Sequence, residues 1–473
     1  MATDTNPHSG SELDIVWFEL HGGNMGGEIE PHIINVSIYE DVFGNFLSAD
    51  VLINDSLNFP VNTPIVGQEH LRFKFRTKSQ ESELNAGDMQ IVSIKKRYLV
   101  KERQQVYMLH CISAPGMSML SQTMSKSYRG MGISSIVHDI YENYFDTDYW
   151  DNLIVEQTKG IDNVIIPNWK VRDALNWLAK RAVNENDCAN YLSYERLNDT
   201  DSNYPDQVFE SVERAVARPP KQRFIYSAGI EDTKKLVKKA QGISELLDLR
   251  IASQFNVMQN MTGGYYASKL VTHDIVKKKI RQQTHSLKDV FIPDINHTDE
   301  YMPIRAGVGE DNSTTVGLGY RECERVSLAP EDAARPTDGV NLEDQYDNKV
   351  MFYPKHDRMY AKSKTDLYDN GVENWKLNRN TMIQSLNQIK LMMSFTGLSN
   401  LHAGNMVEVI VPAAQKVIEE QPGSIKNKEE LLDKQLTGNY LITTIKHTVT
   451  RANNTWEYIC RAEVIKDGIG SPP

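Results

Sequence analysis

Histidines beside acidic residues are the first candidates for acid–base or metal chemistry in this sequence of 473 residues. The adjacent pairs His273-Asp274 and His356-Asp357 are examples. Adjacent residues of a strand point to opposite faces, so neither pair is well placed to act as a dyad or to share a metal ion. The 63 Asp and Glu residues could also provide the two carboxylates of a glycosidase, although the sequence singles out no particular pair.

Longer catalytic motifs are missing from the sequence. It contains no G-x-S-x-G, H-E-x-x-H, Walker A or EF-hand motif. The glycine-containing runs at Gly307 and Gly317 lie in a polar stretch and lack the strand–loop–helix context of a nucleotide site. We therefore predict no catalytic residue, no cofactor and no metal ligand, and a structural or interaction protein rather than an enzyme.

The composition narrows the class further. A net charge of -11 argues against a protein that binds nucleic acid through its phosphates, and a hydrophobic share of 40% supports proper cores. No run of about 18 apolar residues occurs, so we expect no membrane insertion. The polar, acidic start of the chain excludes a secretory signal. The four cysteines are far apart, which favours buried thiols in a protein made in a cytosol.

The clearest pattern is a repeat between the stretches Gly87–Cys111 and Gly438–Cys460. Their first nine residues match at four aligned positions, namely Gly87 and Gly438, Ile91 and Ile442, Ile94 and Ile445, and Lys95 and Lys446. Each stretch continues into a polar turn and an aromatic-containing strand that ends in a cysteine. The repeat predicts two similar β-hairpins, one near each end of the chain.

A second match lies upstream of each hairpin. Gly67 and Gly404 each precede a run in which apolar residues alternate with polar ones, as in a strand with one buried face. We therefore predict two copies of one antiparallel β-unit. The residues expected in their barrel strands and at a subunit interface are Ile91, Ile94, Val407, Val409, Ile442 and Ile445.

Turn signals and periodicity divide the chain into four expected domains. These are a first β-barrel at 1–114, a mixed α/β domain at 115–230, a mixed domain with long polar loops at 231–372, and a second β-barrel at 373–473 with a helical insertion at about 413–436. The fold class is α+β and β-rich, with two similar antiparallel barrels flanking a mixed middle.

Several elements of the middle can be predicted one by one. Helical periodicity predicts a helix capped by Ser134 or Ser135, another over 171–182, and a third over 231–249. Pro167 is expected to stop a short strand over 164–166. The pair Gly263-Gly264 is expected to be the turn of a hairpin.

Four stretches resemble the baseplate hub proteins of contractile-tailed bacteriophages of the T-even type. The run over 38–73 is similar to their first tube domain, and the runs over 387–412 and 438–449 are similar to the second. Between them, a helix segment and a Gly-Tyr strand also match. The residues that carry the resemblance are Asp55, Ser56, Pro64, Ile65, Gly67, Glu69, Pro167, Trp169, Leu178, Ala179, Ala182, Gly264, Tyr265, Thr272 and Asp274. The resemblance covers roughly 14–280 and 373–468 and is weakest over 285–370.

This resemblance implies a homotrimeric ring in which each chain contributes two tube barrels around a channel. Such a ring joins a hexameric tail tube, or a tube-initiator protein, to a trimeric central spike. Baseplate wedge proteins would surround it, and DNA would pass through without specific binding. The protein would then belong to the tail baseplate of a virion, assembled in the cytoplasm of the bacterial host.

Two alternatives stay open. The hub part of type VI secretion spike proteins shares the same architecture, so the chain could be a secretion-system hub. A tail-associated cell-wall hydrolase is the other possibility, although no lysozyme-like catalytic acid stands out.

Overall fold

The computed structural model describes residues 12–22, 25–62, 65–77, 83–146, 149, 151–198, 204–226, 243–291, 295–299, 346–355, 372–413, 432–452 and 455–469. The runs at Gly307 and Gly317, the pair His356-Asp357, Cys323, residues 231–242 of the third predicted helix, and most of the 413–436 insertion lie outside these residues. Within the described part, no helix is both long and apolar enough to cross a membrane.

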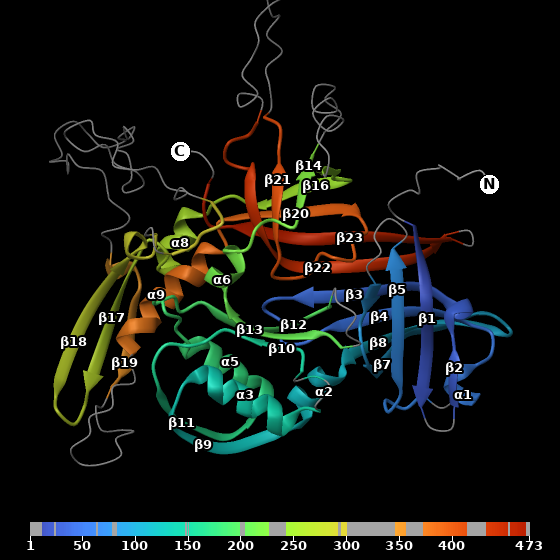
Figure 1. Ribbon diagram of the computed structural model, residues 1–473, viewed down its shortest axis with the longest axis horizontal. Helices are drawn as coiled ribbons and strands as arrows, with labels where there is room; N and C mark the ends of the chain where they lie inside the picture. The colour runs from blue at the N-terminus through green and yellow to red at the C-terminus, as the bar shows by residue number, and fades with distance from the viewer. Residues whose placement is uncertain are drawn as a thin grey trace, which may run out of the picture.

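The N-terminal quarter of the chain forms antiparallel strands, drawn in blue in Figure 1. Their bounds are β1 Glu12–Gly22, β2 Met25–Glu28, β3 Ile33–Asp41, β4 Ser48–Asp55, β5 His70–Thr77, β6 Glu83–Asn85, β7 Met89–Lys101 and β8 Gln104–Ser113. Two short helices, η1 (Glu30–His32) and α1 (Phe59–Asn62), lie in their connections. Apolar residues alternate along β4 and β5, and the burial of the side chains alternates with them.

The C-terminal strands lie beside this first unit in the same 15-stranded sheet. They are β20 Ile389–Thr396, β21 Met406–Ile410, β22 Gly438–Ala452 and β23 Thr455–Lys466. Three strands from the middle of the sequence join them, namely β14 Gln222–Ile225, β15 Ile243–Glu245 and β16 Asp248–Ser253. An isolated bridge between Pro412 and Leu432 brings together the two ends of the predicted insertion.

The two ends of the chain repeat one strand order. The first unit runs β3-β4-β8-β7-β5 and the second runs β16-β20-β23-β22-β21, with every neighbouring pair antiparallel. A break in register falls between Ile91 and Ser93 in β7 and between Ile442 and Thr444 in β22, which are aligned positions of the repeat. Gly67 and Gly404 both have positive φ, +96° and +83°. A β-bulge and a glycine turn at matching places confirm that the repeat is structural.

The prediction that the second strand of each hairpin ends in an equivalent cysteine was wrong. Cys111 lies opposite Ile91, whose counterpart Ile442 lies opposite Val464, whereas Cys460 lies opposite His447. Cys460 is therefore in the middle of its strand. The two hairpins share their first strand and bulge but not the length of strand beyond it.

The two units join edge to edge, so that strand pairing closes a circuit. The order around it is β22-β3-β4-β8-β7-β5-β1-β23 and back to β22. One hydrophobic core fills the space enclosed by these strands, with buried residues from both units. Burial of this shared core couples the folding of the two chain ends, because neither unit encloses it alone.

The middle of the chain packs helices and small sheets beneath the large sheet in Figure 1. The elements are α2 Ala114–Ser121, β9 Thr123–Met131, α3 Ile133–Tyr144, β10 Leu153–Val155, β11 Asp162–Lys170, α5 Val171–Arg181, β12 Tyr191–Arg196, β13 Asp206–Ser211 and α6 Val212–Val216. The first two predicted helices are confirmed as α3 and α5, although Gly132 rather than a serine is the N-cap of α3. Pro167 does not stop its strand, because β11 continues past it through a break in register.

A further group of elements lies apart from the sheet circuit. It consists of α8 Val257–Gly263, β17 Ala267–Asp274, β18 Lys279–Ser286, η2 Leu287–Asp289, η4 Tyr346–Asn348, β19 Val350–Pro354 and α9 Val372–Ser385. The hairpin expected at Gly263-Gly264 was wrong, because α8 ends there and the hairpin follows as β17–β18. The helix expected over 231–249 was also wrong where it is described, since 243–245 and 248–253 are strands.

Candidate functional site

The residues predicted for the barrel strands lie in the core shared by both units. Five of the six are buried there, namely Ile91, Val407, Val409, Ile442 and Ile445, and Ile94 packs against them partly buried. Their assignment to barrel strands at a subunit interface stays a prediction. The feature of this region with chemical potential is the seam at which the two units meet.

Two strand pairings form the seam. Residues 444–450 of β22 pair with residues 35–41 of β3, and Leu13 of β1 lies opposite Trp456 of β23. Side chains add bonds across it. Asn35 donates to the Thr450 hydroxyl at 2.7 Å, and the hydroxyls of Thr77 and Ser399 lie 2.9 Å apart.

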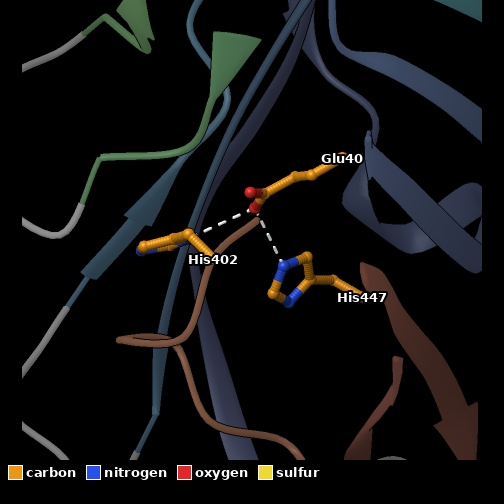
Figure 2. Close-up of side chains that lie close together, drawn as sticks. All are labelled: Glu40, His402 and His447. Atoms are coloured by element: carbon orange, nitrogen blue, oxygen red, sulfur yellow. Dashed lines mark hydrogen bonds and ion pairs between the residues drawn. The ribbon is translucent and has the colours of Figure 1, made fainter. Parts of the chain in front are cut away.

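A buried carboxylate with two histidines occupies the seam, and we call it the carboxylate–histidine cluster. Glu40 comes from β3, His402 from the loop between β20 and β21, and His447 from β22, and each is 1% exposed. Figure 2 shows the two imidazoles on either side of the carboxylate. His402 Nδ1 lies 3.1 Å and His447 Nε2 lies 3.0 Å from the same Glu40 oxygen, Oε1. The other oxygen accepts the N–H of Ala403 at 2.9 Å.

Both nitrogens of His447 have partners. Nδ1 lies 2.7 Å from the Tyr458 hydroxyl and 3.5 Å from Cys460 Sγ, and Nε2 donates to Glu40. The pKa of this ring is raised to about 10, which favours the doubly protonated imidazolium. His402 donates to Glu40 through Nδ1, while its Nε2 is buried without a hydrogen-bond partner. Both imidazoles thus donate to one oxygen of the same buried carboxylate.

Electrostatics in the seam keep this pair ionised. Burial alone would raise the pKa of Glu40, but the two histidines outweigh it and lower the pKa to about 2. Burial alone would lower the pKa of His447, but its contacts with Cys460 and Glu40 raise it to about 10. A carboxylate and an imidazolium thus stay charged inside the protein because each compensates the other.

This arrangement supports one of two kinds of chemistry. Two imidazoles and a carboxylate are ligands that Zn²⁺ accepts, and one ligand atom from each residue lies within 4.8 Å of the others. A metal ion would require a neutral His447, however, and the bond to Tyr458 together with the raised pKa favours the protonated ring. The geometry therefore fits a buried ion pair that holds the two units together better than a metal centre. We call this ion pair the ionic clasp.

Sequence reasoning missed all three residues of the cluster. Glu40 is 362 residues from His402 and 407 residues from His447 along the chain. No spacing rule connects residues so far apart, and each lies in an ordinary strand or turn sequence. The pair that the sequence did single out, His273-Asp274, lies on β17 with His273 exposed and Asp274 buried. Asp274 accepts two backbone N–H groups of the following turn, which is a structural role.

Two concave sites on the described surface differ in size and in the chemistry of their linings. The smaller, about 310 Å³, includes Glu19 and Asp88, but these carboxylates form ion pairs with His21 and Arg72. The larger, about 470 Å³, lies between α5 and α9. Its lining residues are Trp177, Lys180, Arg181, Tyr353, Trp375, Lys376, Arg379, Asn380, Ile383 and Gln384. This lining has no carboxylate, so it does not offer the paired acids that a glycosidase uses.

Comparison with known proteins gives a likeness of fold. No family model and no curated protein sequence matches the chain. Among solved structures, the chain is similar to the 43 kDa tail protein of prophage MuSo2 from Shewanella oneidensis, with a TM-score of 0.50 at 9% identity over 96% of this chain and 99% of that one. A tail protein from Neisseria meningitidis MC58 gives 0.49 at 10% identity over 96% and 98%. A type VI secretion component from E. coli, described as similar to T4 tail proteins gp27 and gp5, gives 0.46 at 9% over 98% and 79%.

Proposed function

We propose that this chain is the structural hub of a phage tail baseplate, a homotrimeric ring between the tail tube and the central spike. The observation that carries the proposal is the repeated strand order with its matching bulge, two copies in one chain. The fold shared with a prophage tail protein supports the same class of role.

Symmetry matching is the mechanism of such a hub. Three chains with two similar units each present six similar elements to a sixfold tube, while the trimer keeps a true threefold axis for a trimeric spike. The repeated unit is therefore the functional feature, and a catalytic residue is not required. In this proposal the two units of each chain take neighbouring places around the tube, and the seam sets the angle between them.

The carboxylate–histidine cluster fits that role. A buried ionic pair loses much stability when its geometry is disturbed, since each charge then lacks its compensating partner. It therefore favours one orientation of the two units over neighbouring ones. We propose that the clasp fixes the angle on which closure of the ring depends.

The remaining partners follow from the proposed position in the tail. A tube or tube-initiator protein would bind one end of the ring, the spike the other, and wedge proteins the outside. The net charge of -11 suits a channel through which DNA passes without binding. The location would be the virion tail, with assembly in the host cytoplasm.

Mass measurement in solution tests the proposal directly. Mass photometry or sedimentation at micromolar concentration should show a species of three times the 53.8 kDa chain. Subunit interfaces of an obligate ring bury on the order of 2,000 Å² or more, so the trimer should survive dilution. A stable monomer in the absence of partners would contradict the ring.

A peptidoglycan zymogram addresses the alternative of a cell-wall hydrolase. We expect no clearing at the position of the purified chain. A clearing band that persists after repurification would instead show a catalytic function. The control is a lysozyme lane run on the same gel.

A further inference from the structure

The seam inside the chain has a counterpart whose two strands each leave one edge open in the described part of the chain. In the seam, β22 of the second unit pairs along residues 444–450 with β3 of the first unit. The repeat makes β7 the counterpart of β22 and β16 the counterpart of β3. The corresponding pairing would therefore join β7 to β16.

The counterpart of β3 can be assigned residue by residue. Ile38 of β3 lies opposite Ala49 of β4, just as Ile251 of β16 lies opposite Leu391 of β20. Ala49 and Leu391 occupy matching places because their own partners, Cys111 and Val464, lie opposite the aligned residues Ile91 and Ile442. The same steps match Leu249 with Val36.

The counterpart of β22 is assigned in the same way. Leu99 of β7 lies opposite Gln105, and Val449 of β22 lies opposite Tyr458. Cys111 and Val464 are a matched pair. Gln105 precedes Cys111 by as many residues as Tyr458 precedes Val464, so Gln105 and Tyr458 also match. Leu99 is therefore the counterpart of Val449.

Both counterpart strands have an open edge in the described part of the chain. Beyond Gln90, β7 pairs with β8 alone, and β16 pairs with β20 alone at the end of the sheet. Burial shows the difference from the seam. Val449 is 1% exposed, whereas its counterpart Leu99 is 77% exposed. Ile38 is fully buried, whereas its counterpart Ile251 is 52% exposed.

The open edge of β7 carries exposed apolar side chains, as expected of a surface that binds another chain. Leu99 lies between two other exposed apolar residues, Tyr98 at 56% and Val100 at 49%. A long edge strand with exposed apolar side chains is a template for pairing with another chain. β7 and β16 belong to different units, and the seam shows how a strand of one unit adds to the edge of the other.

We propose that β16 of a second copy adds antiparallel to β7, with Leu99 opposite Leu249 and Tyr98 opposite Arg250. This contact repeats between copies the seam that β22 and β3 make within one copy. It is heterologous, so successive copies continue in one direction until the ring closes. The inference rests on the proposed hub function, and it specifies which edges form the subunit interface and in which register.

Cysteine cross-linking tests the register. Opposite residues of an antiparallel pair have Cβ atoms about 4.5–5.5 Å apart, close enough for a disulfide after modest adjustment. The double variant Tyr98→Cys with Arg250→Cys replaces two exposed side chains and should give covalent dimers and trimers under mild oxidation. The matched control, Tyr98→Cys with Phe352→Cys, pairs β7 with the exposed β19, where Phe352 is 75% exposed. It should cross-link at least tenfold less, and single-cysteine variants measure the background from native thiols.

A second experiment tests the same interface in case the cysteine variants do not fold. Leu99→Asp should abolish assembly and leave the melting temperature of the monomer unchanged, since Leu99 is exposed within the chain. Phe352→Asp should assemble like the wild type. A wild-type trimer with cross-linking no higher than the control, or a Leu99→Asp trimer, would overturn the edge pairing while leaving the hub proposal intact. A wild-type monomer would overturn both.

Discussion

Glu40→Gln should destabilise the protein by about 3–4 kcal/mol at neutral pH. The amide keeps the size of the side chain and can still accept the N–H of Ala403, but it no longer carries the charge that His402 and His447 stabilise. The pKa of Glu40 falls from 4.5 to about 2, and at 1.36 kcal/mol per pKa unit this corresponds to about 3 kcal/mol. The rise for His447 from 6.5 to about 10 comes first from Cys460 and only then from Glu40, so it is not added to this value.

Differential scanning fluorimetry and urea unfolding are suitable assays. For a cooperative unit of 150–250 residues, each kcal/mol lowers Tm by about 2–4 °C, so we expect a decrease of roughly 6–16 °C. The matched control is Glu408→Gln on β21, which breaks a partly exposed ion pair with Arg223 and should cost less than about 1 kcal/mol.

The pH dependence distinguishes the ionic clasp from simple packing. The folded pKa of Glu40 is depressed, so its contribution is present above pH 4.5 and is lost as pH falls through about 2. The folded pKa of His447 is raised, so its contribution is present below pH 6.5 and is lost as pH rises through about 10. The stability difference between wild type and Glu40→Gln should be greatest between pH 4.5 and 6.5 and should shrink toward pH 10. A difference that stays constant from pH 6 to pH 10, or a variant as stable as the wild type, would refute the ionic clasp.

Three further tests address the shared core, the turn at Gly404, and the possibility that the carboxylate–histidine cluster holds a metal ion. Ile442→Asp places a charge in the shared core and should cost several kcal/mol, seen as loss of soluble protein; normal expression and melting would contradict the strand assignment. Gly404→Ala should lower Tm clearly, because its Cβ would lie 2.2 Å from the Tyr194 hydroxyl. Gly160→Ala, also at positive φ but with no atom within 4 Å, should lower it much less; equal effects would show that the contact does not matter. EDTA should leave Tm unchanged, and one tightly held Zn²⁺ per chain by elemental analysis would instead make the carboxylate–histidine cluster a metal centre.

Local pattern was enough to predict most regular elements. Alternation at 389–395 and helical spacing at 171–182 gave β20 and α5, because one buried face imposes its period on the sequence. It failed at 243–253, where apolar residues suit a helix as well as a strand. There β14 and β20 supply the partners that make β15 and β16 strands, and a pairing partner remote in sequence leaves no local signal.

The sequence by itself determined that one β-unit occurs twice, because the glycine and isoleucine positions that specify its bulge and turn are local. Only the tertiary structure decided how the copies meet. It joins β22 to β3, encloses one core between them, and brings Glu40 to two histidines from the opposite end of the chain. It also leaves β7 and β16 with open edges in the described residues. Edge pairing and burial depend on contacts between distant segments, and the spacing of residues along the chain does not record them.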